Sequence, residues 1–444
     1  GTIPVLAAAS ATAITSTPEE LNALDGITAV VGELNALDIG ATAVGTAVAS
    51  KAVILDSNKD YTGLRNLTIT GELDAATLDI SGNVDVDGTT ETDVLTINGS
   101  QLNYKAFGTS SIMFGDTTTG TIDAANYNTG VGVDVFQDIT TGDNNSVIGY
   151  RAGYNISTGG NNTLIGHESG SSVSTASYNT VIGALAYDGS NAANNTAIGY
   201  ASLGGSVTGD NNTAVGYTAL TANTSGTRNT AVGFNAGGAI TTGGNNVAMG
   251  YNSLATNTVG DRNVAIGEQA LVTLNPATNA DTYNVGVGYS AGEAITTGIN
   301  NTLIGALAGD ALTDADYNVA IGIQALGGDT LGSRSVAIGS GALQVQNFTT
   351  ATNSYNTAIG YDAGNKVSTG TNNTLIGGLA GDSLTTGSNN VAVGEEALST
   401  DDLGSKSTAI GGNALANQNY ATATDSFNTA VGFDAGVAVT TATE

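Results

Sequence analysis

A five-residue motif, Asn-Thr-Ala-Ile-Gly in its form at Asn195–Gly199, returns so regularly that it decides what this chain can fold into. Anchored on its glycine, the motif occurs eighteen times, and it usually returns after about 17 residues. Self-similarity at a fixed short period is typical of solenoids, in which each unit packs only on its neighbours. We therefore predict an all-β protein, a parallel β-roll or β-solenoid with coils of about 17 residues. The motif glycines are Gly132, Gly149, Gly166, Gly183, Gly199, Gly216, Gly233, Gly250, Gly267, Gly288, Gly305, Gly322, Gly339, Gly360, Gly377, Gly394, Gly411 and Gly432.

The fourth residue before the motif glycine is asparagine in every copy except Ser335 and Ser407. Stacked parallel coils place identical side chains about 4.7–4.9 Å apart, so that their amides can hydrogen-bond along a ladder. We predict that this asparagine column is structural. Its representatives are Asn162, Asn195, Asn212, Asn229, Asn301 and Asn373.

Within the motif, the strand period of two sends Thr196 and Ile198 to one face and Ala197 and Gly199 to the other. We expect the bulky position to fill the roll, and the small face to let another backbone approach closely. A roll built from such small residues buries little apolar area per residue, which favours oligomerisation. The representative residues are Ile198, Ile304 and Ile376 for the bulky position, and Gly199, Gly216, Gly233, Gly305 and Gly377 for the small one.

A longer period overlies the short one. The spacing widens by four positions before Gly288, Gly360 and Gly432, which defines a superrepeat of about 72 residues within 217–432. Every fourth coil should therefore carry a longer loop, at 271–282, 343–354 and 415–426. These loops are candidates for lateral contacts, and a tolerated insertion without a partner is the alternative.

The chain before the array divides into two further segments. In residues 1–50, Thr17-Pro18-Glu19-Glu20 has the form of a helix start with a capping box, which predicts short helices. In residues 51–124, alternating stretches at 66–70, 78–80, 84–86 and 94–97 predict short strands and hairpins of a stalk. The repeat array fills residues 125–444. Because the chain starts at Gly1 without Met and ends within a repeat, we expect a processed or partial polypeptide.

Charge and composition exclude several classes of partner. Ten basic and 39 acidic residues give a net charge of −29, which argues against nucleic acid as a partner, because binding to phosphates needs clustered Lys and Arg. The longest apolar run, Ile3–Ile14, is too short to span a membrane, so membrane insertion is not expected. The absence of cysteine excludes disulfides and thiolate metal sites.

No residue pattern predicts catalysis, a cofactor or a metal. Gly288-Tyr289-Ser290-Ala291-Gly292 matches a hydrolase nucleophile motif, but other coils carry Asn235 and Asp362 at the serine position, so the match is a by-product of the repeat. His167, the one histidine, is interpreted as a surface residue. The turn aspartates Asp143, Asp210, Asp261 and Asp310 are interpreted as solvated rather than as a weak calcium site, and Asp85 and Asp87 lack the other ligands of an EF-hand. We expect a protein that is not an enzyme.

The unit Asn212-Thr213-Ala214-Val215-Gly216-Tyr217-Thr218-Ala219-Leu220 resembles the head repeats of trimeric autotransporter adhesins of the YadA-like class. The resemblance covers residues 125–444. It implies a trimeric, left-handed parallel β-roll, although the usual repeat of that family is shorter.

Three N-terminal stretches, at 20–26, 50–56 and 65–71, look like tail-fibre and related structural proteins of tailed bacteriophages, particularly cyanophages. Together the two resemblances imply an elongated homotrimeric virion fibre for host attachment, at the virion surface or otherwise extracellular. Its partners would be its own copies, other virion proteins and a host-cell receptor. The alternative is a bacterial trimeric surface adhesin or extracellular filament subunit. Ice binding is disfavoured, because the motif supplies one Thr beside an apolar residue and not a paired Thr-x-Thr face.

Overall fold

The computed structural model describes residues 95–97, 100–102, 104–107, 111–115, 124–187 and 191–443. These residues belong to one of the two units into which the chain divides, Glu91–Glu444. The helices expected within 1–50, and the strands expected at 66–70, 78–80 and 84–86, lie outside the described residues. Strand β1 (Leu95–Ile97) falls within the stretch expected at 94–97 and pairs antiparallel with β2 (Ser100–Leu102).

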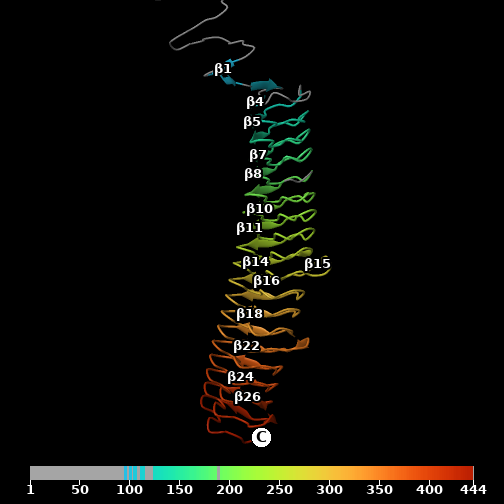
Figure 1. Ribbon diagram of the computed structural model, residues 1–444. Helices are drawn as coiled ribbons and strands as arrows, with labels where there is room; N and C mark the ends of the chain where they lie inside the picture. Colours follow the sequence, from blue (N-terminus) through green and yellow to red (C-terminus); the bar gives the residue numbers. More distant parts are fainter. Residues whose placement is uncertain are drawn as a thin grey trace, which may run out of the picture. The chain divides into compact units, whose positions relative to one another are not determined.

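The repeat array is a single ladder of short parallel strands. A hairpin of β3 (Tyr104–Phe107) and β4 (Ser111–Gly115) begins it, and β4 pairs in parallel with β5. Each motif then supplies one strand, which pairs in parallel with the strand of the next coil (Figure 1). In order, the strands are β5 (Thr129–Gly132), β6 (Ser146–Ile148), β7 (Thr163–Ile165), β8 (Thr180–Ile182), β9 (Thr196–Ile198), β10 (Thr213–Val215), β11 (Thr230–Val232), β12 (Val247–Met249), β14 (Val264–Ile266), β16 (Val285–Val287), β17 (Thr302–Ile304), β18 (Val319–Ile321), β20 (Val336–Ile338), β22 (Thr357–Ile359), β23 (Thr374–Ile376), β24 (Val391–Val393), β26 (Thr408–Ile410) and β28 (Thr429–Val431).

The register never shifts along this ladder. Thr213 of β10 pairs with Thr196 of β9 and Thr230 of β11, so that each motif position forms a straight column. No helix occurs among the described residues. The predicted all-β parallel solenoid, with coils of about 17 residues, is confirmed for the described array.

The backbone turns after each strand because the motif glycine adopts a conformation that other residues avoid. Gly199 has φ of +125°, and a Cβ atom built on it would lie 2.4 Å from the carbonyl oxygen of Gly216 in the next coil. The other motif glycines repeat this geometry with φ between +125° and +146°. The small position therefore admits the backbone of the next coil of the same chain.

The expectation that the Ile/Val position fills the roll is wrong. The middle residue of each strand is buried and its two neighbours face outward, as in β9, where Ala197 is fully buried while Thr196 and Ile198 are half-buried. Ile304 is 38% exposed and Ile376 is half-buried. Alternation divides the strand into two faces, and the face that turns inward carries the middle residue, which is usually alanine and is leucine in β7, β17 and β23, while the Ile/Val position lies outside.

Larger core side chains come from the turn that follows the strand. In most coils with glycine four residues after the motif glycine, an aliphatic residue follows three residues later, as in the pair Gly237 and Ile240. Where leucine takes the glycine position, the later residue is usually polar, as in the pair Leu254 and Asn257. Most coils thus fill the same space from one of two positions, whereas the coil with Leu271 and Leu274 buries a large side chain at both.

The superrepeat within 217–432 is visible in the structure. Each of its long coils adds a two-residue strand that pairs in parallel with the coil before it. Figure 1 shows β15 at the margin opposite the main ladder. The three pairs are β13 (Gly260–Asp261) with β15 (Ala280–Asp281), β19 (Gly332–Ser333) with β21 (Thr352–Asn353), and β25 (Gly404–Ser405) with β27 (Thr424–Asp425).

Candidate interaction surface

The asparagine column forms a buried ladder. The backbone N–H of Asn301 donates to Oδ1 of Asn284 (3.0 Å), and its side-chain Nδ2 donates to the same oxygen (3.1 Å) and to the carbonyl of Ala315 (2.7 Å). Oδ1 of Asn301 in turn accepts from the backbone N–H of Asn318 (3.0 Å). Each asparagine thus satisfies backbone groups of the coils on both sides, which water cannot reach.

The other representatives show that the ladder depends more on side chain to backbone bonds than on amide to amide bonds. Asn162 bonds the preceding side chain as Asn301 does, whereas the Nδ2 atoms of Asn212, Asn229 and Asn373 donate to carbonyls of the next coil. In every case the backbone N–H of the asparagine donates to the preceding Oδ1. Asn195 differs, because its coil is one residue shorter and its Nδ2 donates to the hydroxyl of buried Tyr187 (3.3 Å).

The two exceptions in the column are parts of a buried polar cluster. Ser407 contacts the hydroxyl of Ser426 and accepts from Nε2 of Gln418 (2.7 Å), which also donates to a carboxylate oxygen of Asp401 (2.6 Å). Oε1 of Gln418 accepts from Asn428 (2.7 Å), where the ladder resumes. The same cluster recurs one superrepeat earlier, as Asp329, Ser335, Gln346, Ser354 and Asn356.

The carboxyl group in this cluster is perturbed by its burial. Loss of solvent raises the pKa of Asp401 above its ordinary value, although hydrogen bonds from Gln418 and from backbone N–H groups partly oppose the shift. Sequence reasoning missed this cluster. Its signal was the joint change of four positions between superrepeats, in which Asn257, Asn263, Leu274 and Thr282 become Asp, Ser, Gln and Ser.

The outward face of the ladder is the largest candidate surface for contact. It consists of a column of Thr, Ser or Val at the first position of each strand and a column of Ile, Val or Met at the last side-chain position. Neither column contains a charged residue in the eighteen strands from β5 to β28, although the chain carries a net charge of −29. In the second column, the residues exposed by 36% or more are Val131, Ile148, Ile182, Met249, Ile266, Ile304, Ile359, Ile410 and Val431.

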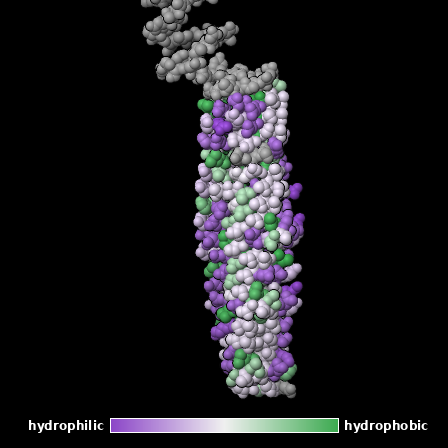
Figure 2. All heavy atoms as spheres, turned by 45° about the vertical axis from the view of Figure 1, so that its right-hand side comes forward, coloured by the Kyte–Doolittle hydropathy of each residue, from purple (hydrophilic) through white to green (hydrophobic). Residues whose placement is uncertain are grey.

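A continuous uncharged face of this length is unusual at the surface of a monomer. Figure 2 shows a face of the array on which pale and apolar atoms follow the long axis over much of its length, between hydrophilic margins. A surface of this kind marks a site of contact with another molecule.

The residue after the motif glycine forms a third outward column. In four consecutive coils it is aromatic, and the rings of Tyr200, Tyr217, Phe234 and Tyr251 stack with centroids 5.2–5.3 Å apart and interplanar angles of 5–17°. We call these four residues the aromatic ladder. Each ring is 46–50% exposed, so that the ring edges face solvent while the faces cover one another.

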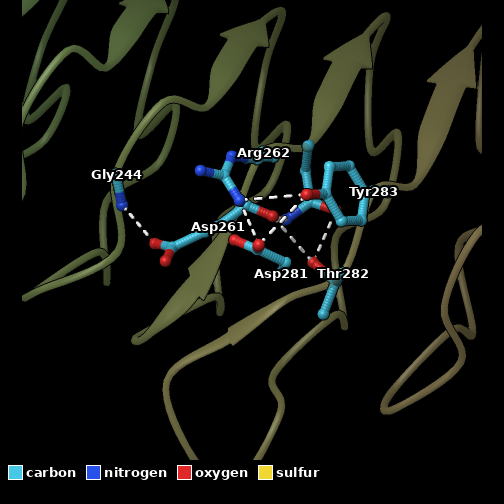
Figure 3. A network of polar contacts seen from close by, with 7 residues as sticks. Gly244, Asp261, Arg262, Asp281, Thr282 and Tyr283 are labelled. Atoms are coloured by element: carbon cyan, nitrogen blue, oxygen red, sulfur yellow. Dashed lines mark hydrogen bonds and ion pairs between the residues drawn. The ribbon is translucent and has the colours of Figure 1, made fainter.

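In the coil before each long coil, a cationic side chain lies between an acceptor and an aromatic ring of the long coil. Arg262 pairs with Asp281, donates to the hydroxyl of Tyr283 (3.0 Å) and lies with its guanidinium carbon 5.6 Å from the centre of that ring (Figure 3). At the equivalent positions, Arg334 donates to Asn353 (3.1 Å), and Lys406 pairs with Asp425 (2.7 Å) and lies over Phe427. These contacts fasten each long loop to the coil before it. They do not test whether the loops make lateral contacts.

Three of the turn aspartates have a structural partner. Asp143, Asp210 and Asp261 each accept, at 2.6–2.8 Å, the backbone N–H of the residue 17 positions earlier. Figure 3 shows this bond between Asp261 and Gly244. Besides the contact with solvent that the sequence predicts, these carboxylates therefore pair with backbone groups of the preceding coil.

The candidate catalytic residues do not come together. Ser290 is buried, and His167 lies on an exposed part of another coil, stacked on Tyr150 with ring centroids 5.4 Å apart. Among the residues that the structure describes, no group of three or more His, Cys, Asp or Glu side chains could hold a metal ion. Over the same residues, no helix is long and apolar enough to cross a membrane.

Comparison with known proteins adds no assignment, because no family model and no curated protein matches the sequence.

Proposed function

We propose that this chain is a structural fibre protein whose repeat array forms a rigid shaft by associating with further copies of itself. The observation that carries the proposal is the uncharged outward face of β5–β28, which stays in one register over eighteen coils. A partner that covers such a face along its whole length needs the same axial period, and a second copy of the chain has that period by construction.

The association we propose is a homotrimer whose symmetry axis runs parallel to the direction in which the coils stack. An axis in this direction keeps equivalent coils of all copies at the same height, so that each outward column meets copies of the same set of columns. The number three rests on the resemblance of the repeats to trimeric adhesin heads. The exposed Ile and Val side chains supply the apolar area, and the charges of the chain lie elsewhere.

For the biological setting, we propose a tail fibre or similar appendage of a phage virion, which holds a host-attachment region away from the particle. This part rests on the N-terminal resemblance. The partners would then include other virion proteins and a receptor on the host cell.

Association is tested by substitutions on the outward face. Sedimentation of the native chain should give the mass of three copies, and Ile304→Lys with Ile376→Lys should give a monomer near 43.7 kDa, because two lysines per copy would be placed in an apolar contact. Tyr178→Lys is the matched control, since Tyr178 is 62% exposed but lies outside the outward columns and the long loops, at a position where other coils carry Arg228 and Lys406. A native chain that stays monomeric at micromolar concentration contradicts the proposal.

The setting is tested separately by electron microscopy with an antibody against the chain. Labelled appendages on purified phage particles support the virion fibre. Label confined to bacterial cell envelopes, with none on particles, supports the surface adhesin or filament instead.

A further inference from the structure

Self-association through the outward face leaves one problem unsolved, which is the axial register. Sliding one copy by a single coil places Thr374 where Thr357 was and Ile376 where Ile359 was, so that the two columns meet nearly the same side chains as before. The long loops and their cationic side chains recur once per superrepeat and therefore tolerate a slide of four coils. A shaft with aligned ends needs a feature that occurs once.

The aromatic ladder is such a feature. In the superrepeat at 217–288, the residues after the four motif glycines are Tyr217, Phe234, Tyr251 and Glu268. At the equivalent positions, the next superrepeat has Tyr289, Ala306, Ile323 and Ser340, and the third has Tyr361, Gly378, Glu395 and Gly412. Among the described coils, a run of stacked rings in four consecutive coils occurs only between Tyr200 and Tyr251.

The ladder is also continuous with the outward face. Thr213 and Val215 point outward from β10, Ala214 points inward, and Tyr217 continues the outward alternation after the motif glycine. The backbone pairing continues with it, because the residue that follows Tyr217 donates its N–H to the carbonyl of Tyr200 (3.0 Å). The ring column therefore borders the Ile/Val column at half exposure, where it can take part in the same contact.

We propose that the aromatic ladder sets the axial register of neighbouring copies in the fibre, its four rings packing against the four rings of the next copy. This inference rests on the proposed self-association. In register, all four ring levels coincide. A slide by one coil leaves three ring levels in contact. It places Tyr200 of one copy opposite Ala184 of its neighbour, and Tyr251 of that neighbour opposite Glu268 of the first copy. Each further step removes another ring level, so that the penalty grows with the slide.

The test uses the natural absence of cysteine from the chain, which makes engineered thiols unambiguous. Two chains are coexpressed, one with Thr357→Cys and one with Thr374→Cys, and the assemblies are oxidised and digested. Disulfides between two copies of one reporter indicate aligned coils, and disulfides between the two different reporters indicate a slide by one coil. The fraction of mixed disulfides therefore measures the register.

The ladder variant replaces Tyr200, Tyr217, Phe234 and Tyr251 with alanine. The column already accommodates small residues at Ala184, Ala306 and Gly378, so the coil itself should fold unchanged. The matched control replaces Tyr289, Tyr361 and Phe433 with alanine. These three residues occupy the same column but do not belong to the aromatic ladder. We expect mixed disulfides to rise about tenfold in the ladder variant, the ratio that corresponds to about 1.4 kcal/mol, and to stay at the native level in the control.

Sedimentation of the same samples separates the two proposals. A monomeric native chain overturns self-association and the register proposal with it. A multi-chain assembly in which the ladder variant and the native chain give equal fractions of mixed disulfides overturns the register proposal alone. An assembly that forms neither kind of disulfide places the outward face away from the contact, and this result also overturns the register proposal.

Discussion

At the scale of single residues, the repeat is governed by positions at which one side chain alone satisfies the geometry. Asn301 shows this for polar groups, because its amide bonds two neighbouring coils at once. Gly377 shows it for space, because its φ is +135° and a Cβ atom would lie 2.4 Å from the carbonyl oxygen of Gly394. The chemistry of asparagine made the first role predictable from the sequence. Its bonds to carbonyls of the next coil could not be foreseen without knowing where the turn lies.

Two adjacent glycines provide a sharp test of the steric argument. Gly377→Ala should destabilise the array by more than about 3 kcal/mol, because the methyl group overlaps backbone that has no room to move. Gly378→Ala should change stability by less than about 0.5 kcal/mol, since a Cβ atom there meets nothing within 4 Å. Urea unfolding followed by circular dichroism measures both. Equal effects of the two substitutions would contradict the account of the glycine column.

At the scale of the coil, the sequence predicts the strand but not which of its faces is buried. Alternation along Thr196-Ala197-Ile198 defines two faces, and general hydrophobicity points to isoleucine as the inner residue. The structure reverses this choice, because the buried position is the middle residue of the strand, which is usually alanine but is leucine in β7, β17 and β23, and the isoleucine lies outside. Alternation alone does not encode which of the two faces turns inward. The buried Asp–Gln–Ser cluster escaped prediction for a related reason, since its members are far apart in sequence and meet only when coils stack.

In the turn after the strand, some coils pair glycine with a later aliphatic residue and others pair leucine with a later polar residue. This exchange predicts that two substitutions at these positions compensate for each other. Gly237→Leu alone should overpack the core, because a Cβ atom at Gly237 would already lie 3.0 Å from Cδ1 of Ile240. Ile240→Asn alone should leave a void around a buried amide. The double variant reproduces the arrangement of Leu254 with Asn257 in the following coil, so it should be more stable than the sum of the single effects predicts, by about 1–3 kcal/mol. A double-mutant cycle of unfolding free energies measures this coupling, and additive effects would refute it.

Burial of Asp401 predicts a local dependence on pH. Because its folded-state pKa is raised, the folded coils bind a proton more tightly than the unfolded chain does. The contribution to stability is therefore fully present below the ordinary carboxyl pKa of about 3.9, and it is lost as pH rises through the raised pKa. Asp401→Asn should remove this component, because asparagine does not ionise.

Hydrogen exchange of the amides around Gly404 and Ser407 reports this stability without contributions from distant carboxylates. The difference in opening free energy between the native chain and Asp401→Asn should change in favour of the variant as pH rises from about 4 to 7. Substitution of the exposed Asp434 by asparagine is the control and should leave exchange at these amides unchanged. A difference that does not vary with pH would show that the buried carboxyl keeps an ordinary pKa.

At the scale of the whole molecule, charge and apolar area are separated. The Thr/Ser/Val column and the Ile/Val/Met column of β5–β28 contain no charge, while each chain carries a net charge of −29. Association through that face would bring like-charged rods together without placing their charges in direct contact. The repulsion is then long-range, and salt screens it over a Debye length of about 30 Å at 0.01 M and about 8 Å at 0.15 M.

We therefore expect association to weaken as salt is lowered from about 0.15 M to about 0.01 M, and to change little above that range, where screening is nearly complete. Sedimentation equilibrium across this series, at constant protein concentration and pH, gives the association constants. An interface built on ion pairs such as Arg262 with Asp281 would behave in the opposite way, because salt weakens contacts between opposite charges. Association that strengthens at low salt would thus move the contact from the apolar face to the charged margins of the roll.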